Sequence, residues 1–204
     1  MVIILILLFS LFDIVSYHKA ASVFHMIQNV LLESTWTKGL NYFLNDRAYN
    51  YYNAKHLYDA LQKAVNQDSP EDPIDVANIM TTWEMQGGLP VLHVYVNETE
   101  ITFTQERFLY GSEESENIWS VPINYIVGSN LDFSITLPDF WLHERSVTIQ
   151  SGSAPKPWTA NELVIVNARA SGYYRVNYDT LSWARIINHL HGPFHEIDPI
   201  NRGQ

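Results

Sequence analysis

The stretch DVANIMTTWEMQGGLPVLHVYV, residues 75–96, contains the change of hydrophobic period that decides the fold. From Val76 to Trp83 the apolar residues recur at the three- and four-residue spacing of one helix face, and Asp75 stands where an N-cap is expected. After two glycines and a proline, apolar residues alternate with their neighbours through residues 92–96, as in a strand with one buried face. The sequence therefore predicts a helix before the glycine pair and a strand after it.

The residues before this stretch predict three more helices. Apolar residues keep the helical spacing from position 16 to about position 65. Each helix is expected to begin at a side chain that can accept a hydrogen bond from a free backbone N–H group: Ser16 for the first, Ser34 or Thr35 for the second, and Asn53 for the third.

The residues after this stretch predict short strands. Residues 92–96 and 101–103 would form a hairpin, and further strand-like runs follow at residues 118–127, 132–137, 146–149, 163–168 and 173–178. Short strands separated by turn residues indicate a small antiparallel β-sandwich. The helical period returns only at residues 181–190, so the predicted class is α+β.

Composition and charge exclude several kinds of partner and site. The 204 residues carry a net charge of −10, which disfavours nucleic acid and anionic membrane surfaces because Lys and Arg drive binding to phosphates. The absence of cysteine removes disulfides, thiolate nucleophiles and Cys-ligated zinc. The apolar start, residues 1–12, is shorter than the roughly 20 residues of a membrane-spanning helix. It is read as a signal-like segment, as a buried segment, or as a start codon placed inside a longer gene.

No metal or catalytic motif emerges from spacing alone. The strings HERSV, residues 143–147, and HEIDP, residues 195–199, begin like the zinc motif H-E-x-x-H but lack its second histidine. His189, His191 and His195 form the densest histidine group, and the Gly-Pro pair within it favours a structural or surface role. No metal ligand is therefore predicted.

The string FDIVSYHKAASV at residues 12–23, followed in order by further strings, resembles motifs of the zinc aminopeptidases of the aminopeptidase N type, a gluzincin family. That family's pattern for this stretch is F-D-x-I-S-Y-x-K-G-A-S-V, and Ala20 stands in place of its glycine. Further strings with family counterparts are GLNYFL at 39–44, YNA at 52–54, IM at 79–80 with WEMQGGLPV at 83–91, GYYRVNYD at 172–179 and PINRGQ at 199–204. The resemblance covers about residues 11–204.

This resemblance implies a multidomain fragment. Residues 1–88 would be the C-terminal helices of a thermolysin-like catalytic domain, residues 89–181 a β-sandwich domain, and residues 182–204 the start of a helical C-terminal domain. The family's zinc ligands and its G-x-M-E-N motif would lie in missing N-terminal segments, so the chain alone is expected to bind no zinc and to be inactive. The parent enzyme would remove N-terminal residues from peptides with zinc-activated water.

One catalytic residue is carried over by the resemblance. Tyr17 matches the family's catalytic tyrosine, whose phenol stabilises the oxyanion formed in the transition state. The resemblance also implies a plasma-membrane or extracellular location, where the sequon at Asn97 would be a glycosylation site. Two alternatives remain: a non-enzymatic secreted or surface interaction module built on the sandwich, and a secreted inactive homologue that uses residues 1–12 as its signal.

Overall fold

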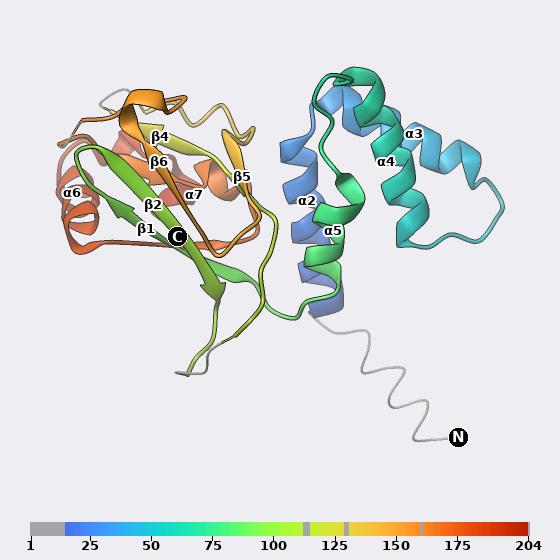
Figure 1. Ribbon diagram of the computed structural model, residues 1–204, viewed down its shortest axis with the longest axis horizontal. Helices are drawn as coiled ribbons and strands as arrows, with labels where there is room; N and C mark the ends of the chain where they lie inside the picture. Colours follow the sequence, from blue (N-terminus) through green and yellow to red (C-terminus); the bar gives the residue numbers. More distant parts are fainter. Residues whose placement is uncertain (1–14, 112–114, 129–130, 160, 204) are drawn as a thin grey trace.

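The computed structural model describes residues 15–111, 115–128, 131–159 and 161–203. Within these ranges the protein is α+β, with helices first, strands next and short helices at the end (Figure 1). The predicted signal-like segment at residues 1–12 lies outside the described residues. No helix in the described ranges is long and apolar enough to cross a membrane.

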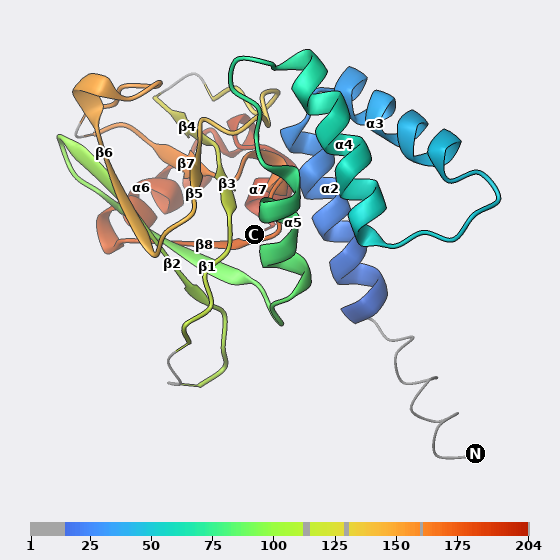
Figure 2. The ribbon, with the colours of Figure 1, turned by 45° about the vertical axis from the view of Figure 1, so that its right-hand side comes forward.

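From residue 15 onward, the N-terminal half consists of one π-helical turn and four α-helices. They are η1 (Val15–Lys19), α2 (Ala20–Val30), α3 (Glu33–Asp46), α4 (Ala54–Asp68) and α5 (Val76–Glu84). Helices α2 and α5 lie next to the strands, whereas α3 and α4 form the outer side of the molecule (Figures 1 and 2). Gly88, with φ of +86°, follows α5 and adopts a left-handed conformation that glycine tolerates where the chain turns toward the first strand.

Two of the predicted helix starts are confirmed. Asn53 caps α4, because its side chain accepts a hydrogen bond from the N–H of His56 at 3.2 Å while its own N–H donates to the His56 ring at 3.1 Å. Asp75 caps α5 by accepting from the N–H of Asn78 at 2.9 Å.

The other two predicted starts are wrong. Helix α3 begins at Glu33 after an extended Leu32, so Ser34 and Thr35 lie inside its first turn. The negative charge of Glu33 stabilises this helix start, because the N-terminus is the positive end of the helix dipole. Ser16 lies inside the π-helical turn η1, because helical backbone already begins at Val15.

The strands form one four-stranded sheet and two small pairs. The four-stranded sheet has the order β6–β2–β1–β8, made of β6 (Ser146–Gln150), β2 (Glu100–Arg107), β1 (Pro90–Val96) and β8 (Arg175–Tyr178). The pairs are β3 (Val121–Ile123) with β5 (Phe140–Leu142), and β4 (Tyr125–Val127) with β7 (Val164–Val166). The predicted hairpin is confirmed, since Val96 pairs with Ile101 across the β1–β2 turn.

The strands depart from the prediction in three ways, the first of which is that residues 140–142 form β5, where no strand was predicted. Strand β8 pairs with β1 in parallel, with Leu92 opposite Val176, because β8 reaches the sheet by a crossover instead of a hairpin. Residues 132–137 form no strand: the Asp132 carboxylate accepts from the N–H of Ser134 at 2.8 Å, a local bond that competes with a strand ladder. Phe133 is buried in a separate apolar cluster.

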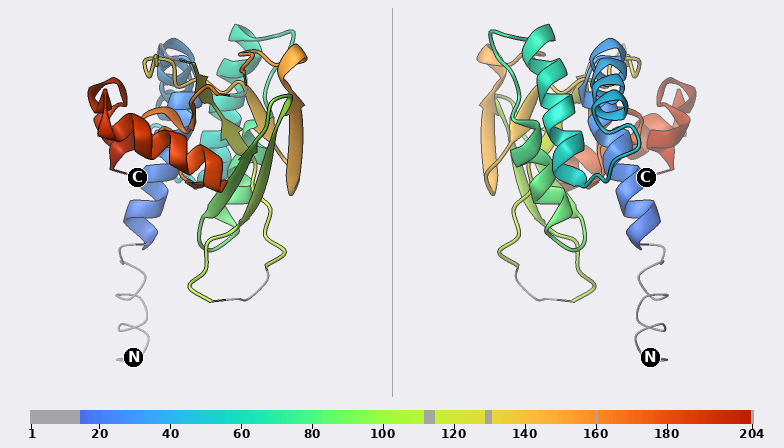
Figure 3. Two further views of the ribbon diagram at one scale, coloured as in Figure 1. Left: turned by 90° about the vertical axis from the view of Figure 1, so that its left-hand side faces the viewer. Right: turned by 90° about the vertical axis from the view of Figure 1, so that its right-hand side faces the viewer.

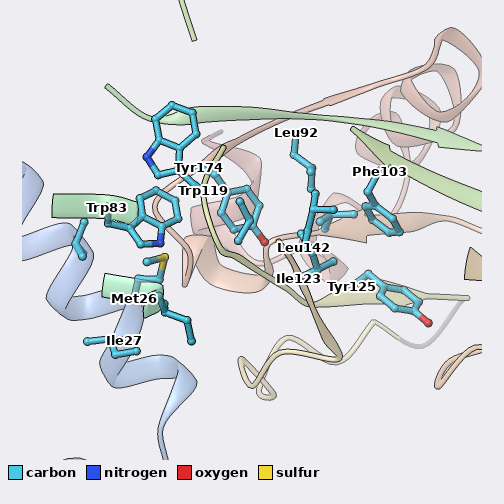
Figure 4. Close-up of a cluster of buried hydrophobic side chains, with 14 of the residues drawn as sticks. Met26, Ile27, Trp83, Leu92, Phe103, Trp119, Ile123, Tyr125, Leu142 and Tyr174 are labelled. Atoms are coloured by element: carbon cyan, nitrogen blue, oxygen red, sulfur yellow. The ribbon is translucent and has the colours of Figure 1, made fainter. Parts of the chain in front are cut away.

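Helices and strands share the main hydrophobic core (Figure 4). Met26 and Ile27 of α2 and Trp83 of α5 belong to the same cluster of buried residues as Leu92 of β1 and Phe103 of β2. The Trp83 indole N–H also donates to the backbone oxygen of Ser120 at 3.0 Å. The helical half therefore buries its apolar face against the strands.

The C-terminal part packs as a smaller unit beside the sheet. It contains α6 (Thr180–His191), the 3₁₀ turn η4 (Phe194–Glu196) and α7 (Pro199–Arg202). Earlier in the described chain lie two further 3₁₀ turns, η2 (Ser151–Ser153) and η3 (Ala168–Ala170). The predicted helix at residues 181–190 is thus confirmed. Helix α6 faces the viewer in the left panel of Figure 3 and α3 and α4 in the right panel, so these helices lie at opposite ends of the molecule.

Candidate functional site

Tyr17 lies at the exposed start of the first helix. The π-helical turn η1 places it one turn before α2, and its side chain is 60% exposed, so a molecule in solution can reach the phenol. Single π-helical turns are often found at functional sites. This position is compatible with the role that the resemblance implies for Tyr17.

A mainly apolar pocket of about 410 Å³ lies beside this helix start. Helices α2, α4 and α5 form its walls, which include Val23, Phe24, Met80 and Trp83. Ala20, at the family's glycine position, also lines the pocket and is exposed, so its methyl group borders open space in the described chain.

Charged and polar side chains stand at the edges of the pocket. Lys19 donates a hydrogen bond to the backbone oxygen of Gln86, which ties the start of α2 to the end of α5. Burial lowers the pKa of Lys19, and the nearby charge of Arg107 lowers it further. The Tyr58 hydroxyl donates to the Glu84 carboxylate at 2.9 Å, and burial, followed by this bond, raises the pKa of Tyr58.

The histidines of the two partial zinc motifs have local partners. The His143 Nδ1 atom lies 3.0 Å from the Ser120 hydroxyl, and its ring stacks on Trp141 with centroids 5.9 Å apart. His195 lies in the short turn η4. Of the C-terminal histidine group, His189 lies 3.2 Å from the Glu196 carboxylate.

The described ranges contain no group of three or more His, Asp or Glu side chains placed to hold a metal ion. A catalytic zinc ion requires about three protein ligands that converge on one point. Such a convergent set is not present among the described residues.

Asn97 shapes the β1–β2 turn. Its side-chain oxygen accepts from the N–H groups of Thr99 at 2.9 Å and Glu100 at 2.8 Å, and its side-chain nitrogen donates to the Glu100 carboxylate at 3.2 Å. The Trp158 indole donates to its backbone oxygen at 3.0 Å. Asn97 follows the end of β1, whereas Tyr17 lies in η1 before α2, so the two predicted site residues belong to different parts of the fold.

The sequence analysis did not predict that Lys19, Glu84 and Arg107 lie in one region of the structure. Lys19 belongs to the string that resembles the family motif, but Arg107 lies 88 positions later, at the end of β2. Periodicity reports only local faces, and no spacing rule links residues so far apart. Their proximity is visible only in the folded chain.

Comparisons with known proteins agree with the resemblance. The family model described as "Peptidase family M1 domain" matches residues 8–83. The chain is 34% identical over 201 residues to aminopeptidase N of Homo sapiens, a match that covers 95% of this chain and 20% of the human protein. It is 32% identical over 200 residues to aminopeptidase Ey of Gallus gallus, covering 95% of this chain and 19% of that protein.

A similar relative comes from an insect. The chain is 31% identical over 204 residues to membrane alanyl aminopeptidase of Heliothis virescens, covering 96% of this chain and 20% of that protein. The chain thus spans about a fifth of the length of the curated relatives that it matches.

Proposed function

The chain belongs to the aminopeptidase N type of peptidase family M1, and we propose that it is part of an enzyme that removes N-terminal residues from peptides. The observation that carries this proposal is the place of Tyr17: an exposed phenol at a π-helical turn, inside the segment that matches the family model. The relatives named above support the reaction class by their names.

The proposed role of Tyr17 is to stabilise negative charge. When water adds to a peptide carbonyl, the carbonyl oxygen becomes an oxyanion. A phenol O–H donates a hydrogen bond to that oxygen most strongly when the charge has developed, and this lowers the barrier to reaction. The zinc ligands of the proposed enzyme would come from residues other than those described here, so the 204-residue chain alone would be inactive.

We also propose the division of the chain that the resemblance implies. Residues 1–88 would complete a catalytic domain, residues 89–181 would form a sandwich domain, and residues 182–204 would open a helical domain. The change from helices to strands between α5 and β1 supports the first boundary, and the start of α6 supports the second. In the complete protein, other segments of the same protein would be the main partners of these parts.

The proposed enzyme would act at the plasma membrane or outside the cell. The name of the Heliothis virescens relative supports this location. Asn97 would then be glycosylated on the secretory route, in an N-x-T sequon in which Asn97 is half-buried and Glu98 and Thr99 are exposed. Loss of an endoglycosidase-sensitive mobility shift in Asn97→Gln would support the modification, and an unchanged shift would contradict it.

The test of the reaction is a Tyr17→Phe variant of the complete protein assayed on aminoacyl arylamides. Removing one oxyanion donor is expected to lower kcat by about 100-fold to 1,000-fold, with a smaller effect on KM. The 204-residue chain by itself should show no chelator-sensitive hydrolysis.

The matched control is Tyr95→Phe, which changes an exposed tyrosine on β1. This variant should keep the kcat of the parent. Full activity in Tyr17→Phe, or an equal loss in both variants, would refute the proposed role of Tyr17.

A further inference from the structure

The start of α2, the end of α5 and the end of β2 lie near one another at one edge of the molecule (Figures 1 and 2), and two cationic side chains belong to this region. Arg107 lies close enough to Lys19 for its charge to lower the pKa of Lys19, in addition to the larger effect of burial. Within the described ranges neither forms an ion pair with a carboxylate. Two like charges held together without a counter-ion are unfavourable.

The guanidinium of Arg107 is also incompletely bonded. Its Nε atom is buried and has no hydrogen-bond partner among the described residues. The side chain lies against the backbone of the glycine pair, since a Cβ atom built at Gly87 would lie 3.6 Å from Nη2 and one at Gly88 3.1 Å from Nε. A buried N–H group that lacks a partner costs free energy, and the cost is greater when the group is charged.

The apolar pocket begins at Lys19, and Arg107 lies against Gly87 at its edge. Lys19, Gln86 and Gly87 line one side of it, while Val23, Phe24, Met80 and Trp83 supply the apolar surface. Its volume of about 410 Å³ lies within the range of about 300–1,000 Å³ that is typical of small-molecule sites.

The acidic group at the pocket sets the orientation of a ligand. Glu84 lines the pocket and accepts a hydrogen bond from Tyr58. Its negative charge repels an anion, so an acidic group on a ligand is favoured at the Lys19 side and an apolar group in the remainder of the pocket.

We propose that Lys19, Arg107 and the adjoining pocket bind an organic carboxylate that carries an apolar group. The carboxylate accepts hydrogen bonds from the ammonium and guanidinium groups, a strong charge-assisted arrangement, and supplies the missing counter-charge. The apolar group packs among Val23, Phe24 and Met80. A medium-chain fatty acid and the C-terminal residue of a peptide share this chemistry, and the site is independent of the proposed hydrolysis.

The experiment is isothermal titration calorimetry of the 204-residue chain with matched probes. The acids are octanoate and N-acetyl-leucyl-phenylalanine, and the controls are acetate, octanol and the C-terminal amide of the dipeptide. At least one acid should bind about tenfold or more tightly than its neutral counterpart and than acetate, because a hydrogen bond to a charged group contributes about that factor. Binding of octanoate alone assigns the site to fatty acids, and binding of the peptide acid alone assigns it to peptide C-termini; either supports the proposal, as does binding of both.

The variants connect binding to the two cations. Lys19→Met and Arg107→Met should each weaken binding of the preferred acid by about tenfold or more, whereas Lys19→Arg should retain most of it. Lys55→Met, at an exposed lysine on α4, is the matched control and should bind like the parent. Circular dichroism melts establish that each variant is folded. If Arg107→Met does not fold, the binding measured for Lys19→Met alone tests the proposal. No binding by either acid, equal binding of acid and neutral probe, or unchanged binding in Lys19→Met overturns the proposal.

Discussion

At the scale of the residue, Asp179 connects the sheet to the C-terminal helix. One carboxylate oxygen accepts from the N–H groups of Leu181 at 2.9 Å and Ser182 at 3.0 Å, which caps α6. The other accepts from the N–H of Val96 at 3.0 Å and from the Ser182 hydroxyl at 2.7 Å. Burial raises the pKa of Asp179, but these hydrogen bonds outweigh it and the pKa is lowered overall.

This arrangement predicts acid-sensitive stability. A carboxylate whose pKa is lowered in the folded state contributes its full stability above the unfolded pKa of about 3.9 and loses it as the pH falls through the folded value. Asp179→Asn keeps a cap but presents an amide N–H₂ group toward donors such as Val96 N–H. It should lower the free energy of unfolding at pH 7 by about 1–3 kcal/mol, measured by urea denaturation.

The pH dependence distinguishes this contribution from simple packing. The difference between parent and Asp179→Asn should shrink at pH 3, because the parent carboxylate is then being protonated. Asp59→Asn, at an exposed carboxylate on α4, should change stability little at either pH. A difference between parent and Asp179→Asn that is constant from pH 7 to pH 3 would contradict the assignment.

At the scale of the element, α3 and α4 depend on a close approach at Gly39. Gly39 is buried in α3, and a Cβ atom there would lie 2.7 Å from Leu61 Cδ2 and 3.1 Å from Leu61 Cα. Such contacts are too short, and the backbone atom cannot move without shifting α4. The absence of a side chain therefore sets the separation of the two helices.

Gly39→Ala is expected to destabilise the protein by about 1–3 kcal/mol in thermal or urea unfolding, because overpacking outweighs the gain of about 1 kcal/mol in helix propensity. Gly111→Ala is the control, since a Cβ atom at Gly111 meets no atom of the described residues within 4 Å. If Gly39→Ala proves as stable as the parent, the two helices can separate at little cost and the close approach does not determine their packing.

The elements also show what the sequence can predict. The caps at Asn53 and Asp75 were predictable because a cap depends on residues two or three positions away. The irregular course of residues 132–137 was not, since Phe133 belongs to an apolar cluster with residues distant in sequence such as Ile186 and Ile197. The parallel pairing of β8 was missed for the same reason, because alternation marks a strand but does not name its neighbour.

The candidate site also has one part that the sequence could predict and one part that it could not. Tyr17 became a candidate through the motif resemblance, since an isolated tyrosine at a helix start has no distinctive period or spacing. The grouping of Lys19, Arg107 and Glu84 depends on α2, α5 and β2 meeting at one edge, which no local pattern encodes. Local physics therefore predicts most helices here, whereas tertiary contacts determine the site.

At the scale of the whole molecule, one core joins the helices to the strands. Trp83 is fully buried and belongs to a cluster that extends from α2 to β1 and β2. The centroid of its ring lies 6.1 Å from that of the Trp119 ring and 6.2 Å from that of the Tyr173 ring, and both of these residues follow the helical half in sequence. Without the strands, the helical half would expose this apolar surface to water, which is unfavourable by about 25 cal/mol per Å².

A shared core predicts that helices and strands lose stability together. Trp83→Ala should cost about 3–5 kcal/mol, because it removes a large buried side chain and leaves a cavity. Hydrogen exchange measured by mass spectrometry should show lower protection in both α2 and β1. Trp83→Phe, which keeps most of the apolar volume but loses the hydrogen bond to Ser120, should give the same pattern at a smaller magnitude. This variant tests the prediction if the alanine variant does not fold.

Trp183→Ala, at a tryptophan of α6 that is 37% exposed, is the matched control and should leave the hydrogen-exchange protection of α2 unchanged. Reduced protection confined to the helices would mean that the strands are stable without them, and the core would then be two units in contact instead of one.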